Sequence, residues 1–141
     1  MGSEIKVGDI MSKNVISVTR EASIMEVAKL MEKYNVGSIV VADKRKAEGI
    51  ITERDIVRKL IDTGKDSAKA KASDAMSSPL KVITAEASIE TAAKAMREYR
   101  IKRLPVISGK NELVGLISEG DIMRVFPSIV DLLEERAAAG Q

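Results

Sequence analysis

The chain of 141 residues contains no cysteine and no histidine, and only 2% of its residues are aromatic. Without cysteine there is no disulfide and no thiol nucleophile, and without either residue type the usual ligands of zinc are missing. The lack of histidine also excludes the serine–histidine and cysteine–histidine pairs that activate nucleophiles. So few aromatic side chains cannot form a stacking platform for single-stranded nucleic acid. On these grounds we do not expect an enzyme.

Long apolar segments and a strong charge of one sign are missing as well. No stretch is long and apolar enough to span a bilayer, and the N-terminus lacks the pattern of a secretory signal. The formal net charge is only +2, which does not by itself indicate a nucleic-acid or membrane partner. We therefore expect a cytoplasmic protein with no membrane partner. The hydrophobic fraction of 45% is typical of a globular domain.

What the chain does contain is an internal repeat. The segment Gly49–Ile56 recurs as Gly115–Ile122. In both copies a glycine opens a short apolar run, a hydroxyl residue follows, and an aspartate stands three positions later. Other residues that match between the two halves are Asp9 and Asp74, Met11 and Met76, Ser12 and Ser77, Thr19 and Thr84, Glu21–Ile24 and Glu86–Ile89, Tyr34 and Tyr99, and Val41 and Val106. We interpret this pattern as a duplication.

Each half predicts the same order of elements, which is strand–helix–strand–strand–helix. The hydroxyl residues Ser23 and Ser88 are expected to cap the first helices, whose apolar residues follow at helical spacing. Tyr34 and Tyr99 end these apolar stripes, so we expect their rings in the core with exposed hydroxyls. The ranges expected for the strands are 15–18, 38–42 and 49–52 in the first half, and 80–83, 103–107 and 114–118 in the second. The closing helices are expected from 53 to about 61 and from 119 to about 125.

The fold class predicted from this order is α/β (α+β), with two β-α-β-β-α units. The strands are continuously apolar, which suits sheets that are covered on both faces. Pro105 cannot donate to a sheet ladder, so its strand is expected at an edge or with a local distortion. We assign residues 7–61 to the first unit, 62–71 to a polar linker, 72–126 to the second unit and 127–138 to a C-terminal helix.

The candidate functional residues are Thr52 with Asp55 and Ser118 with Asp121. Each hydroxyl precedes a predicted helix, whose unpaired N–H groups and dipole suit a phosphate. The aspartates would then be free to bind sugar hydroxyls. The structural alternative is a plain helix cap, which stabilises by about 1 kcal/mol with no ligand present.

These motifs, in this order, resemble a tandem pair of CBS domains, the regulatory module named after cystathionine β-synthase. The resemblance covers residues 7 to 126. It rests on the two Asp-x-Met leads, the two hydroxyl-x-x-Asp motifs, and the segments Val36–Val41 and Ile101–Val106. It implies that the two units pack through their sheets about a pseudo-two-fold axis and leave two clefts. Family members commonly bind AMP, ADP, ATP or S-adenosylmethionine there.

The resemblance also implies roles for individual residues. Asp55 and Asp121 would hold the ribose, and Thr52 and Ser118 would contact phosphate.

A basic pair that often reaches phosphate in this family is matched by Lys102 and Arg103. Their counterparts in the first unit are Gly37 and Ser38, so we expect two clefts that are not equivalent. On the side of the first unit, Arg54 is the one candidate cation.

The leading hypothesis is a non-catalytic sensor of adenine nucleotides that needs no cofactor, forms a homodimer and regulates an unidentified protein. The alternative is an adaptor without a ligand, in which the aspartates are only helix caps. Nucleic-acid binding ranks lower, because no predicted helix carries a concentrated basic face. Two separated aspartates could in principle do acid–base work, but no substrate is indicated.

Overall fold

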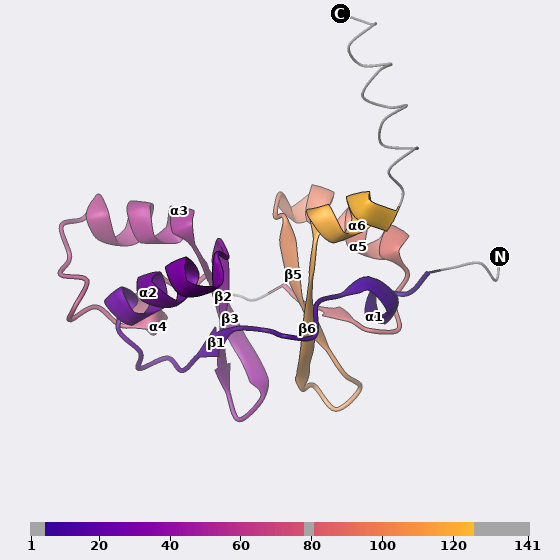
Figure 1. Ribbon diagram of the computed structural model, residues 1–141, viewed down its shortest axis with the longest axis horizontal. Helices are drawn as coiled ribbons and strands as arrows, with labels where there is room; N and C mark the ends of the chain where they lie inside the picture. The colour runs from indigo at the N-terminus through magenta and orange to yellow at the C-terminus, as the bar shows by residue number, and fades with distance from the viewer. Residues whose placement is uncertain (1–4, 78–80, 126–141) are drawn as a thin grey trace, which may run out of the picture.

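The computed structural model describes residues 5–77 and 81–125, so the helix predicted at 127–138 lies outside the described residues. The two halves of the chain lie side by side, with their sheets toward the middle of the molecule and most helices on the outer sides (Figure 1). The longest described helices have 11 residues. None of the described helices could cross a membrane.

Both halves have the predicted order of elements, which confirms the mixed α/β fold. The first half contains β1 (Ser17–Val18), α2 (Ile24–Tyr34), β2 (Ser38–Asp43), β3 (Lys46–Thr52) and α3 (Glu53–Ile56), which continues as the π-helix η1 (Val57–Ile61). The second half contains β4 (Ile83–Thr84), α5 (Ile89–Tyr99), β5 (Arg103–Ile107), β6 (Leu113–Ser118) and α6 (Glu119–Val125).

The first helix of each half begins at the predicted hydroxyl cap. The Ser23 Oγ accepts a hydrogen bond from the Glu26 N–H, and the Ser88 Oγ accepts one from the Thr91 N–H, both at 3.1 Å. Each of these bonds satisfies an N–H of the first turn that has no partner within the helix. The apolar stripes of α2 and α5 are buried against their sheets, as the periodicity predicts.

Each half has a three-stranded sheet in which the middle strand pairs in parallel with the first strand and antiparallel with the third. β5 is such a middle strand, so the edge position considered for Pro105 is wrong. In the first half, the Val40 N–H donates to the Ile16 carbonyl at 3.2 Å. Pro105 stands at the equivalent position and has no N–H to donate. The register of β5 against β6 shifts next to it, between Val106 and Ile107.

Two short helices of the described chain cross between the halves, and neither is among the elements predicted from the sequence. α1 (Val7–Ile10) precedes the first repeat but packs on the second half, where the Val7 N–H donates to the Ala87 carbonyl at 2.8 Å. α4 (Ala72–Ala75) precedes the second repeat but packs on the first half, where the Ala72 N–H donates to the Ala22 carbonyl at 2.7 Å. Val7 belongs to the core of the second half, and Ala72 and Ala75 belong to the core of the first. Each core is therefore completed by the leading segment of the other repeat.

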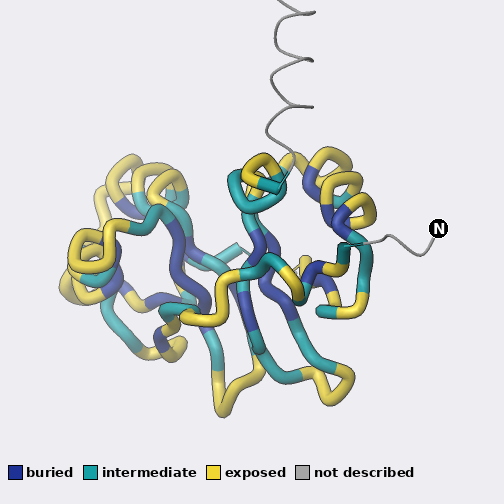
Figure 2. Tube along the Cα trace, turned by 45° about the vertical axis from the view of Figure 1, so that its right-hand side comes forward, coloured by how far each residue is buried: buried dark blue, intermediate teal, exposed yellow. Residues whose placement is uncertain are grey.

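The glycine that opens each repeated motif is explained by this exchange. A Cβ atom added to Gly49 would lie 2.6 Å from the Sδ and 3.0 Å from the Cβ of Met76, which follows α4. Gly115 meets Met11, which follows α1, in the same way. The methionines of the Asp-x-Met leads thus pack directly on backbone that has no side chain. The buried strands and the exposed outer helices and hairpin tips are compared in Figure 2.

We expect Gly49→Ala to lower the free energy of unfolding by about 1–3 kcal/mol, because the added methyl group overpacks the contact with Met76. Gly109→Ala is the matched control, because nothing lies within 4 Å of a Cβ atom there. Urea denaturation of both variants measures the difference. Equal stabilities of the two variants would contradict the packing role of Gly49.

Candidate functional site

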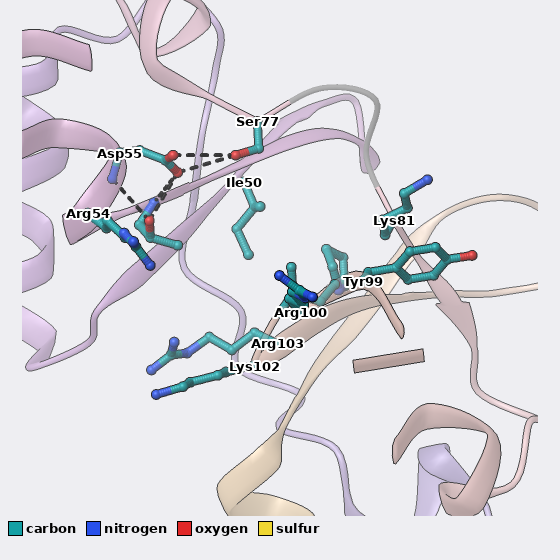
Figure 3. Close-up of a pocket in the computed structure, with 12 residues that line it drawn as sticks. Ile50, Arg54, Asp55, Ser77, Lys81, Tyr99, Arg100, Lys102 and Arg103 are labelled. Carbon is teal, nitrogen blue, oxygen red and sulfur yellow. Dashed lines mark hydrogen bonds between the residues drawn. The ribbon is translucent and has the colours of Figure 1, made fainter. Parts of the chain in front are cut away.

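A cleft of about 510 Å³ lies between the two halves (Figure 3). Its walls come from both repeats and from the segment after α4. The lining residues are Ile50, Thr52, Arg54, Asp55, Ser77, Lys81, Tyr99, Arg100, Ile101, Lys102, Arg103 and Pro105. One cleft therefore brings together the hydroxyl–aspartate motif of the first repeat and the basic pair of the second.

Thr52 and Asp55 form a reciprocal capping box at the start of α3. The Asp55 N–H donates to the Thr52 Oγ1 at 3.1 Å, and the Thr52 N–H donates to the Asp55 Oδ2 at 2.9 Å. The Thr52 hydroxyl also donates to the same Oδ2 at 3.1 Å. Thr52 and Asp55 thus form the helix cap that was the alternative to a ligand site, because these bonds satisfy N–H groups at the helix start without any ligand.

The other carboxylate oxygen of Asp55 is held less closely. The Ser77 hydroxyl lies 3.4 Å from Oδ1, and the Lys59 ammonium group lies 3.5 Å from it. Both distances are longer than those of typical hydrogen bonds to oxygen. Oδ1 therefore has acceptor capacity for a ligand hydroxyl, while Oδ2 keeps the carboxylate in place. The Asp55 side chain is 15% exposed, which is enough for contact from the cleft.

Among the described residues, five cations and one carboxylate line the cleft. Arg54 comes from α3 of the first repeat. The second repeat supplies Lys81, Arg100, Lys102 and Arg103. Within residues 5–77 and 81–125, none of these five cations has a carboxylate within 4.0 Å. Several unpaired cations around one concave surface create a positive potential that favours anions.

The cations occupy two regions of the cleft (Figure 3). Lys102 and Arg103 extend toward the side where Arg54 lies. Lys81 lies on the opposite side, with its Nζ 4.5 Å from the centroid of the Tyr99 ring. Tyr99 is 45% exposed and Tyr34 is 47% exposed, so the core positions expected for both rings are wrong. Tyr99 is the last residue of α5, and its ring packs against the Lys81 ammonium group instead of entering the core.

Arg100 belongs to the same basic cluster of the sequence as Lys102 and Arg103, but its backbone conformation could not be predicted from that cluster. It follows α5 as the C-cap in the left-handed conformation, with φ 55°, as Asn35 follows α2 with φ 52°. Asparagine tolerates this conformation better than other residues with a side chain. An arginine at the same turn accepts some backbone strain and lines the cleft.

The structure differs from the sequence expectation in the position of the basic pair. Lys102 and Arg103 lie across the cleft from Thr52 and Asp55. The cleft that contains the motif of the first repeat therefore has more cations than Arg54 alone. The reason is the packing of the halves, which brings the start of β5 opposite the end of β3. The spacing of residues along the chain does not predict that these two strand ends face each other.

Ser118 and Asp121 do not line this cleft. They cap α6 as the sequence predicts, because the Asp121 N–H donates to the Ser118 Oγ at 3.1 Å and the Ser118 N–H donates to the Asp121 Oδ2 at 2.8 Å. The remaining oxygen, Oδ1, accepts a hydrogen bond from the Arg124 guanidinium group. The two aspartates therefore differ in the availability of Oδ1.

Comparison with known proteins agrees with this architecture. The family model described as CBS domain matches residues 7–62 and 72–128. The CBS domain-containing protein YhcV of Bacillus subtilis is 34% identical over 116 residues, which are 82% of this chain and 81% of that protein. Hypoxic response protein 1 of Mycobacterium tuberculosis is 32% identical over 120 residues, which are 84% of this chain and 83% of that protein.

Solved structures show the same arrangement of elements. The CBS domain pair of protein MJ0100, in complex with 5-methylthioadenosine and S-adenosyl-L-methionine, has a TM-score of 0.79 and 29% identity. The alignment covers 89% of this chain and 98% of that one. A hexameric CBS-CP12 protein from bloom-forming cyanobacteria has a TM-score of 0.77 and 31% identity, over 86% of this chain and 67% of that one.

Proposed function

Because this chain belongs to the CBS-domain family, we propose that it is a non-catalytic regulatory module that binds an adenine nucleotide in the cleft between its halves. The observation that carries this proposal is the position of Thr52 and Asp55 opposite Lys102 and Arg103. A nucleotide has a sugar with hydroxyl donors and a phosphate with negative charge. The two walls of the cleft offer the complement of each group.

In this proposal the ribose hydroxyls donate to the Oδ1 of Asp55. The phosphate lies between Arg54 and the pair Lys102 and Arg103, where charge-assisted hydrogen bonds are short and strong. The adenine ring contacts the apolar part of the lining, which consists of Ile50, Ile101 and Pro105. The phosphate is placed at one part of the cleft and the base at another because the cations and the apolar residues line different parts of it.

The charge of the cleft favours AMP, ADP or ATP over S-adenosylmethionine. The cleft is lined by five cations and one carboxylate, and a sulfonium group adds a further positive charge to such surroundings. Each phosphate adds negative charge that these cations neutralise. We therefore propose that affinity rises from S-adenosylmethionine to AMP and from AMP to ADP and ATP. The similarity to the pair of protein MJ0100 supports an adenosine-type ligand in general.

The proposed regulation follows from the composite nature of the cleft. A ligand that contacts both halves favours the arrangement in which the walls are at the right separation. A change in this arrangement would be passed to a regulated protein that is still unidentified.

We test the proposed ligand by calorimetric titration with AMP, ADP, ATP and S-adenosylmethionine. We expect micromolar binding of ADP or ATP, which corresponds to about −8 kcal/mol, and loss of binding in Asp55→Ala. Asp121→Ala is the matched control, because it removes the same group from the equivalent position outside this cleft, and it should retain the binding that Asp55→Ala loses. Absence of binding by the folded protein would favour the ligand-free adaptor, and binding lost equally in both variants would contradict the assignment of the cleft.

The phosphate contacts are tested by Lys102→Met. We expect the affinity for ADP to fall about tenfold, or 1.4 kcal/mol, while the affinity for adenosine stays unchanged. Lys110→Met removes the same charge from an exposed hairpin residue that does not line the cleft, and it should bind ADP like the unchanged protein. A similar loss for adenosine and ADP would contradict a phosphate contact at Lys102.

We also propose that the protein forms a homodimer through its outer helices. Val57 and Ile61 of η1 are 52% and 65% exposed, and Met123 of α6 is 43% exposed. Exposed apolar side chains on helices of both halves favour association with a second surface.

Sedimentation equilibrium should give twice the mass of one chain, and Ile61→Lys should shift it toward the monomer because the charge would be buried in the interface. Val82→Lys, at an apolar residue away from the outer helices that is 40% exposed, is the control and should leave the dimer intact. A monomer at all concentrations would contradict the homodimer.

A further inference from the structure

Lys59 lies beside the candidate site without lining the cleft. Its Nζ is 3.5 Å from the Asp55 Oδ1, the oxygen that is available to a ligand. The same Nζ donates to the carbonyls of Ala75 and Met76 at 3.1 and 3.3 Å. One ammonium group therefore contacts both the candidate ligand-binding carboxylate and the end of α4, which crosses over from the second repeat.

The carbonyls of Ala75 and Met76 are suitable acceptors for this lysine. Ala75 is the last residue of α4 and Met76 follows it, so their carbonyl groups have no partner within the helix. A lysine near a helix C-terminus can satisfy such carbonyls. Lys59 is partly buried here, with 41% of its side chain exposed. This position differs from that of a fully solvated surface lysine, whose ion pairs contribute little.

The next residue of the crossing segment contacts the same carboxylate. The Ser77 hydroxyl lies 3.4 Å from each oxygen of Asp55. The Ser77 N–H donates to the Ile50 carbonyl at 2.9 Å. Residues 75–77 are thus attached to the first half through Lys59, Asp55 and Ile50. A ligand hydroxyl that binds Oδ1 must share this oxygen with the Lys59 and Ser77 contacts.

The local backbone of the first half explains why a lysine reaches this position. Lys59 lies in the π-helix η1, where the Asp62 N–H donates to the Val57 carbonyl at 3.0 Å, five residues earlier. The wider turn of a π-helix places side chains differently from an α-helix, and such turns are frequent at functional sites. In the second repeat the equivalent residue is Val125 at the end of the regular helix α6, and valine cannot donate a side-chain hydrogen bond.

We propose that Lys59 is a positioning residue that links the carboxylate of Asp55 to the crossing segment, so that a ligand in the cleft changes how firmly residues 72–77 are held. The ligand-dependent part of this inference rests on the proposed nucleotide function. Lys59 touches no ligand. It acts through Asp55 and through the carbonyls at the end of α4.

The test compares Lys59→Met with Arg58→Met, which removes the same charge from an exposed neighbour in η1. Amide hydrogen exchange of residues 72–77 is measured with and without ADP, together with the dissociation constant of ADP. In the unchanged protein and in Arg58→Met, ADP should slow exchange in this segment severalfold. In Lys59→Met, exchange without ligand should be faster, ADP should bind about tenfold more weakly, and its effect on the segment should be lost. Lys59→Arg should restore the response in part.

The outcomes separate this inference from the proposed function. If the unchanged protein does not bind ADP, the proposed function fails, and faster exchange of residues 72–77 in ligand-free Lys59→Met still supports the attachment through Lys59. Unchanged exchange in ligand-free Lys59→Met overturns it. If Lys59→Met only loosens the segment while ADP binds and slows exchange as in Arg58→Met, the lysine has a structural role alone and the link to the ligand is overturned.

Discussion

The exchange of leading segments between the two halves is the constraint on which the rest of the structure depends. α1 and α4 each complete the hydrophobic core of the opposite half, and backbone hydrogen bonds of 2.7–3.1 Å hold them there. The halves cannot separate without exposing apolar residues of both cores, which is costly. Residues far apart in the chain, such as Asp55 and Arg103, therefore line one cleft.

The cleft between the halves combines two kinds of chemistry. The first repeat contributes a hydroxyl and a carboxylate at a helix start, and the second contributes most of the cations. The carboxylate is oriented by its own capping box, since Oδ2 of Asp55 accepts two hydrogen bonds from Thr52. A group that is already oriented loses little further freedom when a ligand binds, which favours affinity. The helix cap and the proposed ligand contact are thus compatible uses of the same residue.

Much of the fold could be predicted from the sequence because its signals are local. The caps Ser23 and Ser88 and the apolar spacing after them define helices within a few residues. The hydroxyl–aspartate motifs were identified for the same reason. The exchange of α1 and α4 and the position of Arg103 opposite Asp55 depend on how distant segments pack, which spacing along one chain does not reveal. Tyr34 and Tyr99 were misplaced because helical spacing does not show whether the last residue of the stripe is covered by other elements.

The divergence of the two repeats has a consequence for how such a cleft can arise. A symmetric pair made of two first repeats would place Thr52 and Asp55 opposite the uncharged Gly37 and Ser38. A pair made of two second repeats would place the basic residues opposite Ser118 and Asp121. The Oδ1 of Asp121 already accepts a hydrogen bond from Arg124. Only the mixed pair joins an accessible carboxylate to a basic wall. Once both copies stand in one chain, each copy can change without a matching change in the other, so the two halves of the proposed site need not come from the same repeat.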